Sequence, residues 1–83
     1  MSAFKNLCQQ RGVNRYDLAK ATKINLNQIR SWEMGIGLPD FMEIVALHKT
    51  LNISFQAIFE LFKENYDKKK NHPMYFSGFN NNF

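Results

Sequence analysis

The chain has 83 residues, 45% of them apolar, and a formal net charge of +4, which suits one small core and is too little sequence for two. It contains no run of eighteen apolar residues, so we expect no membrane span, and its first residues lack the basic and then apolar pattern of a signal peptide. A single cysteine excludes an internal disulfide and is typical of a cytoplasmic protein.

Positive charge gathers in the first part of the chain. Residues 1–32 carry six lysines and arginines against one aspartate, whereas residues 33–66 carry two basic side chains against five acidic ones. A basic segment suits a polyanionic partner such as nucleic acid. An ordinary distribution of solvated charges is the alternative explanation.

Apolar spacing indicates a helix at the start of the chain. Phe4, Leu7 and Cys8 recur at i, i+3 and i+4, which places them on one helical face. We expect this helix near residues 2–11, because Gly12 is typical of the position just beyond a helix end.

The stretch from Asn14 to Gly35 predicts two short helices that meet at a tight corner. Asn14 and Asn25 are both suitable N-caps, so we expect helices near residues 15–22 and 26–33. The second of them has a polar outer face. A helix, a short turn and a second helix of this kind is the arrangement that places the second helix in the major groove of DNA.

The following segment predicts two further helices and no strand. A D-x-x-E capping pattern begins at Asp40 and starts a helix that ends at Asn52, and Ser54 is the natural cap of the next. Both carry apolar side chains at helical spacing, namely Phe41, Ile44, Val45, Leu47 and Leu51 in one and Phe55, Ile58, Phe59, Leu61 and Phe62 in the other. The sequence therefore predicts an all-α fold, a compact five-helix bundle that contains a helix-turn-helix.

The sequence changes character after residue 66. Residues 67–83 contain three lysines followed by an aromatic and asparagine-rich stretch without helical period. We therefore divide the chain into a helix-turn-helix domain at residues 1–66 and a C-terminal tail at residues 67–83. A flexible tail is the simpler interpretation. Docking of its aromatic side chains onto the bundle or onto a partner subunit is the alternative.

The pattern between Leu7 and Phe62 resembles the Cro/CI-type helix-turn-helix of phage repressors, the XRE family. The matching residues are Leu7, Gly12, Asp17, Leu18, Ala19, Ile29, Trp32, Glu33, Gly35, Pro39, Ile44, Leu47, Leu51 and Ile53. Each match is weak alone, and the resemblance rests on their joint spacing over most of the chain. It implies a lambda-repressor-like fold and a protein that binds double-stranded DNA.

The resemblance places base contacts on the first turn and the middle of the second motif helix. These positions are Leu26, Asn27 and Ser31, with Arg30 adjacent. Asparagine can pair bidentately with adenine and arginine with guanine, while serine can reach a base or a phosphate. Leu26 could contact a thymine methyl group or simply pack. For the polar residues, a solvated helix surface is the alternative.

Phosphate contacts are expected where the two motif helices begin, because free backbone N–H groups and the helix dipole favour anions there. The matching positions are Asn14 and Arg15 at the first helix, and Asn25 and Gln28 at the second. The resemblance implies that Arg15 holds the DNA backbone. Its alternative role is that of an exposed charge.

Three positions depart from the family pattern. The loop at residues 36–38 carries no basic side chain and could instead contact a partner subunit. Lys23 stands at a corner where relatives commonly have glycine, so a left-handed backbone there would cost about 1–2 kcal/mol. Cys8 stands where relatives often have an arginine that pairs with the carboxylate matching Glu33. Glu33 must therefore find another donor or lie in water.

No other chemistry stands out in the sequence. One cysteine and two separated histidines do not make a metal site. No nucleophile–base pair, phosphate-binding glycine loop or pair of carboxylates is apparent. We therefore expect no enzyme activity, no cofactor and no metal.

The sequence thus predicts a sequence-specific DNA-binding transcriptional regulator, with the second motif helix in the major groove. We expect a homodimer, because one recognition helix contacts few bases. Its interface would use the last helix, the apolar loop or the tail. The alternative is a protein-interaction module of the same fold, an antirepressor or antitoxin-like partner with weak or no DNA binding, which the non-basic loop and the aromatic tail favour.

Overall fold

The computed structural model describes residues 2–70, and side chains from residue 2 to residue 67. It contains five helices, α1 (Ala3–Gln10), α2 (Arg15–Thr22), α3 (Leu26–Glu33), α4 (Phe41–Leu51) and α5 (Phe55–Lys70), and no strand within the described residues. The predicted all-α bundle of five helices is confirmed.

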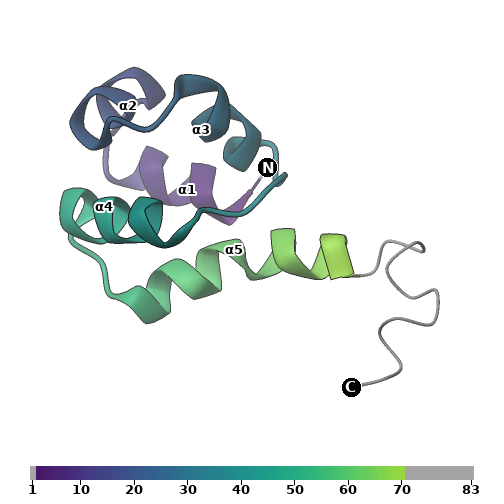
Figure 1. The fold of residues 1–83 in the computed structure, drawn as a ribbon. Helices are drawn as coiled ribbons and strands as arrows, with labels where there is room; N and C mark the ends of the chain where they lie inside the picture. Colours follow the sequence, from purple (N-terminus) through teal and green to yellow (C-terminus); the bar gives the residue numbers. More distant parts are fainter. Residues whose placement is uncertain (1, 71–83) are drawn as a thin grey trace.

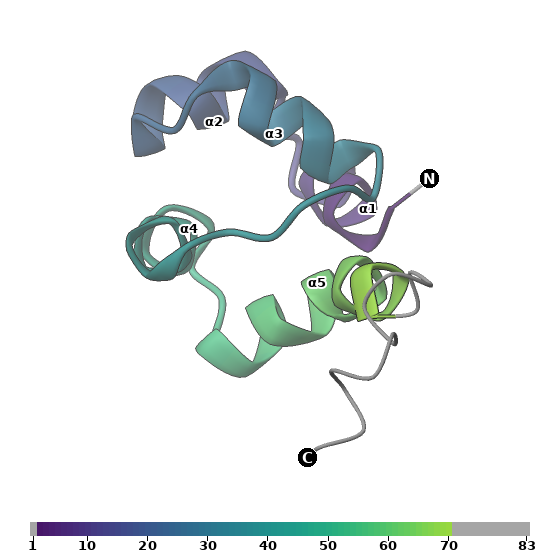
Figure 2. The same cartoon turned by 45° about the vertical axis from the view of Figure 1, so that its right-hand side comes forward.

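Helices α1 and α4 form the middle of the molecule. Helices α2 and α3 pack against each other on one side of the molecule, and α5 lies on the opposite side (Figure 1). Helices α1 and α4 lie between these two sides, with α1 contacting α3 and α5 while α4 contacts α2 and α5 (Figure 2). The helix-turn-helix, α2 and α3, therefore packs on the rest of the bundle through α1 and α4.

The predicted caps start the helices. The side-chain oxygens of Asn14 and Asn25 accept hydrogen bonds from the backbone N–H groups of Asp17 at 2.8 Å and Asn27 at 2.7 Å. Asp40 and Glu43 form a reciprocal capping box at α4, and the Ser54 hydroxyl accepts from a backbone N–H in the first turn of α5. Each cap satisfies a donor that the helix itself cannot, so these starts follow from local sequence.

Trp32 lies at the centre of the core. It is fully buried between the ring of Phe4 on α1, with centroids 5.6 Å apart, and the ring of Phe62 on α5, at 5.3 Å. Both contacts are edge-on, which aromatic rings prefer. The core is completed by Cys8, Leu18, Ile24, Ile29, Leu47, Leu51 and Ile58. Because Trp32 anchors α3 to α1 and α5, the direction in which α3 faces solvent is fixed.

The corner between α2 and α3 has a left-handed backbone. Lys23 adopts a left-handed conformation with φ 62° and ψ 24°, and its N–H donates to the carbonyl of Ala19 at 2.8 Å. The left-handed conformation that the sequence analysis considered for Lys23 is therefore present, although lysine, unlike glycine, has a Cβ. It ends α2 and lets α3 begin three residues later, at Leu26.

Helix α5 is longer than the sequence analysis predicted. It continues through residues 67–70, which the domain division assigned to the tail. Lysine has good helix propensity, and residues 55–72 contain no glycine or proline, so losing the apolar period does not end the helix. The remaining tail, residues 71–83, lies outside the described residues, and so do the predictions made for it.

Candidate nucleic-acid interface

Helix α3 has a buried side and an exposed side. Ile29 and Trp32 are completely buried, whereas Asn27 and Arg30 are exposed. Among the described side chains, no carboxylate lies within ion-pair distance of Arg30. The amide and the guanidinium are therefore available on the surface of the helix for which base contacts were predicted.

The other two predicted base-contact residues are less exposed. Ser31 is half-buried, and its hydroxyl donates to the carbonyl of Asn27 at 3.1 Å. Its oxygen can still accept a hydrogen bond, but donation to a base would require this bond to break. Leu26 is half-buried in the first turn of α3. Its contact with a thymine methyl group stays a prediction.

The predicted phosphate-contact asparagines both act as caps. Asn14 and Asn25 are exposed, and each uses its side-chain oxygen on the first turn of its own helix. The side-chain NH₂ groups remain as donors that could face an anion. Asn14 and Asn25 thus lie at the helix starts, as predicted, while contact with phosphate stays a prediction.

Arg15 is held by Glu33. Its Nε lies 2.9 Å from the Glu33 Oε1, and the Arg15 and Glu33 side chains are 31% and 12% exposed. With cysteine at position 8, α1 supplies no positive charge there for Glu33. The ion pair shows that the donor for Glu33 comes from α2 instead. Sequence analysis missed it since the two residues are too far apart in the chain for any helical spacing to indicate contact.

Cys8 lies next to this ion pair and is buried. Burial and the negative charge of Glu33 raise the pKa of the Cys8 thiol from 9.0 to about 11. Cys8 is therefore a neutral thiol at neutral pH and contributes packing without charge.

Gln28 is turned toward α4. Its side-chain nitrogen lies 3.4 Å and 3.5 Å from the two carboxylate oxygens of Glu43, and the residue is half-buried. These are weak hydrogen bonds by their length. A phosphate contact by Gln28, which stays a prediction, would require the side chain to leave Glu43.

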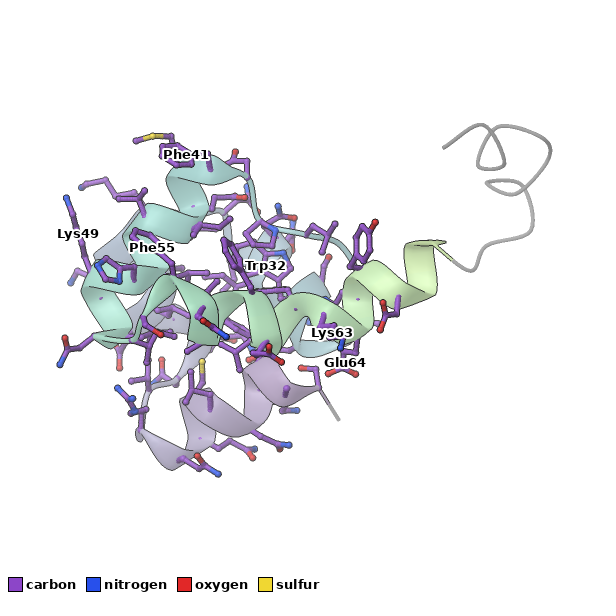
Figure 3. All side chains as sticks on the ribbon, turned by 90° about the horizontal axis from the view of Figure 1, so that it is seen from below. Trp32, Phe41, Lys49, Phe55, Lys63 and Glu64 are labelled. Carbon is purple, nitrogen blue, oxygen red and sulfur yellow. The ribbon has the colours of Figure 1, made fainter. Side chains whose placement is uncertain are left out.

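A second surface feature lies between the loop after α3, the start of α4 and α5. It is an open groove with a volume of about 430 Å³, whose lining is mainly apolar and comprises Leu38, Pro39, Ile44, Ile58, Phe59, Phe62 and Tyr66, with Glu60 and Lys63. The Asn65 side chain donates to the Gly37 carbonyl at 2.9 Å and holds the loop against α5. Figure 3 views the molecule from the α5 side, where Phe55 and Lys63 lie along this helix. We refer to this feature as the α4–α5 groove.

The described residues offer little other chemistry. His48 is half-buried, its Nδ1 lies 2.6 Å from the carbonyl oxygen of Ile53, and its ring stacks on Phe55 with centroids 4.2 Å apart. Within residues 2–70 there is no cluster of side chains that could hold a metal ion. None of the helices in this part of the chain is long and apolar enough to cross a membrane.

The sequence matches a known protein family. A family model described as a helix-turn-helix matches residues 4–58, from α1 to the first turn of α5 and well over half of the chain. Searches of curated proteins and of solved structures found no significant match.

Proposed function

We propose that this chain, which belongs to the Cro/CI-like (XRE) helix-turn-helix family of DNA-binding regulators, recognises a specific sequence in double-stranded DNA and regulates transcription. The observation that carries the proposal is the orientation of α3. Burial of Ile29 and Trp32 leaves Asn27 and Arg30 exposed. In the proposed complex α3 lies in the major groove, where an amide and a guanidinium can read adenine and guanine.

The starts of α2 and α3 would hold the DNA backbone. Asn14 and Arg15 at one helix start and Asn25 at the other combine side-chain donors with the free N–H groups of a first helical turn. Ser31 and Leu26 would complete the base contacts, and Gln28 would join the phosphate contacts after leaving Glu43. Exposed lysines at residues 20 and 23 add positive charge near the corner between the helices.

The active form in this proposal is a homodimer. A recognition helix of eight residues reads few base pairs, and a two-fold axis doubles the site. The α4–α5 groove supports this proposal, since it combines exposed Phe59 and Tyr66 with opposite charges at Glu60 and Lys63. Opposite charges on one patch are self-complementary in a two-fold interface.

Selection of bound sequences from a random pool of duplex DNA tests the proposal. We expect a consensus with two similar half-sites, and binding of the selected duplex well above that of unrelated DNA at moderate salt. Equal affinity for all duplexes would show that the protein binds DNA without reading it. Absence of any binding at low salt would contradict the proposal.

The second candidate function is that of a protein-interaction module with the same fold. The α4–α5 groove favours it, because an open apolar groove with an exposed aromatic rim is a common docking site for a protein segment. In that case the purified protein would bind duplex DNA weakly or not at all, even at low salt, and the selection would yield no consensus. The selection experiment therefore separates the two functions.

A further inference from the structure

We propose that Glu33 is a positioning residue for DNA binding, which holds the Arg15 guanidinium at the start of α2 in the orientation that contacts phosphate. The inference rests on the proposed function and concerns how the backbone contact is made. It starts from an ion pair that joins the end of α3 to the start of α2, with the Arg15 Nε 2.9 Å from the Glu33 Oε1.

The environment of Glu33 makes it dependent on Arg15. Its side chain is only 12% exposed, so an unpaired charge there would be poorly hydrated. The neighbouring Cys8 is a buried thiol and offers no positive charge. Among the described side chains, Arg15 is the only cation within 4 Å of Glu33.

The geometry of the pair leaves most of the arginine free. The ion pair joins Nε to the carboxylate, and the two terminal NH₂ groups of a guanidinium carry four further N–H donors. The Arg15 side chain is 31% exposed and shares the surface at the start of α2 with exposed Asn14 and Tyr16. Glu33 therefore restrains the guanidinium at its Nε, while the Arg15 side chain stays partly accessible.

Two effects of Glu33 oppose each other. Its charge cancels that of Arg15 and by itself weakens attraction to DNA, whereas its bond removes the freedom of a long side chain before DNA binds. We expect the second effect to dominate, because the Glu33 side chain is mostly buried and the Arg15 side chain is the more exposed of the two.

The test measures binding of the selected duplex by wild-type protein, Glu33→Gln, Arg15→Ala and the double variant. The matched control is Asp67→Asn, which removes the same charge from a position on α5 outside the groove lining. We expect Arg15→Ala to weaken binding roughly tenfold, the size of one charge-assisted hydrogen bond. Glu33→Gln should weaken binding to a similar extent although it makes the protein more positive, and the double variant should be no weaker than Arg15→Ala.

A second measurement separates positioning from a loss of fold. Replacing single phosphates by neutral methylphosphonates should identify one position that weakens wild-type binding and has no effect on Glu33→Gln or Arg15→Ala. Glu33→Asp, which keeps the charge on a shorter side chain, should retain part of the phosphate dependence. A general loss of folding would lower affinity without removing the response to that one phosphate.

Two results would overturn the inference. Binding of Glu33→Gln that is as tight as or tighter than that of Asp67→Asn would show that Glu33 opposes DNA binding by competing for Arg15. An equal effect of Arg15→Ala with and without Glu33 would show that the two residues act independently. These results leave the proposed function intact, whereas failure of the wild-type protein to bind any duplex would overturn both.

Discussion

Asn27 and Arg30 are the side chains on which base recognition should depend most, because both are exposed on α3. Replacing either by alanine should weaken binding to the selected duplex by about 1–3 kcal/mol and relax the preference at one or two base positions. Fluorescence anisotropy with the selected duplex and its single-base variants measures both effects. Lys49→Ala, which removes an exposed charge from α4, is the matched control. Unchanged affinity and preference in both variants would show that this surface does not read DNA.

Cys8 should be unreactive in the folded protein. Burial, with the charge of Glu33, raises its pKa from 9.0 to about 11, so the reactive thiolate at pH 8 is about a hundredfold scarcer than for a free cysteine. Alkylation by iodoacetamide, followed by mass spectrometry, should be slow in buffer and fast in denaturant. Its rate should rise with pH through about 11, as thiolate forms. Fast alkylation of the folded protein at pH 8 would contradict this description of Cys8.

The pairing of Arg15 with Glu33 is a contact that the sequence alone does not reveal. Exposure of Asn27 and Arg30 could be predicted, because the apolar residues of the same helix define its buried side. The partner of Glu33 could not be predicted, since this contact depends on how α2 and α3 cross. The departure at Cys8 was the useful signal, because it meant that Glu33 had to find another donor or lie in water.

The corner between α2 and α3 stores a small strain that can be relieved. Lys23 has φ 62°, a region that costs most residues about 1–2 kcal/mol. Lys23→Gly should raise the free energy of unfolding by about 0.5–1 kcal/mol, since the greater freedom of glycine in the unfolded chain offsets part of the gain. Asn52→Gly is the matched control, because Asn52 has φ 54° and asparagine tolerates this region.

Urea denaturation in moderate salt measures the Lys23 effect with little contribution from the lost charge. The gain should be larger for Lys23→Gly than for Asn52→Gly. Equal gains would mean that the side chain of Lys23 compensates for its backbone conformation.

The helices themselves were predictable because their starts are local. Each predicted cap lies within three residues of the donor it satisfies, so the sequence alone contains the interaction. The C-terminal end of α5 was not predictable, because residues 67–70 have no apolar period to indicate burial. A helix can continue on propensity and on its own hydrogen bonds after its contact with the core has ended.

The loop after α3 should contribute little to phosphate binding in its natural form. Ile36 is exposed, whereas Leu38 is half-buried and lines the α4–α5 groove, so only Ile36 is a suitable site for an added charge. Ile36→Lys should raise non-specific affinity and, if it reaches one phosphate, steepen the logarithmic salt dependence by roughly 0.9. Gln56→Lys, at an exposed position on α5, adds the same charge as a control. Equal slopes for the two variants would show that the loop faces away from DNA.

The whole molecule presents two surfaces with different chemistry. The outer side of α3 offers polar and positive groups, and the α4–α5 groove offers apolar ones. Trp32 and the rings that pack on it lie in the core between α1, α3 and α5. Each surface can therefore be altered by substituting exposed residues, with little change in the core, so DNA binding and protein contact can be tested separately.

The last prediction concerns self-association through the α4–α5 groove. Phe59 is 60% exposed, so Phe59→Glu should change monomer stability little but place a charge in the proposed dimer interface. We expect sedimentation equilibrium to show a dimer dissociation constant at least about tenfold higher, the effect of losing roughly 1.4 kcal/mol at one aromatic contact. Phe41→Glu, which makes the same change at an exposed residue outside the groove lining, is the control.

The outcome for DNA binding follows from the same proposal. Phe59→Glu should bind a single half-site as the wild type does, because Asn27 and Arg30 are unchanged, but it should lose the added affinity for a duplex with two half-sites. If the wild-type protein is a monomer at all concentrations tested and Phe59→Glu binds the two-half-site duplex normally, the groove is not the dimer interface. The exposed aromatic side chains of the groove would then be available to a different protein. This result would favour the second candidate function.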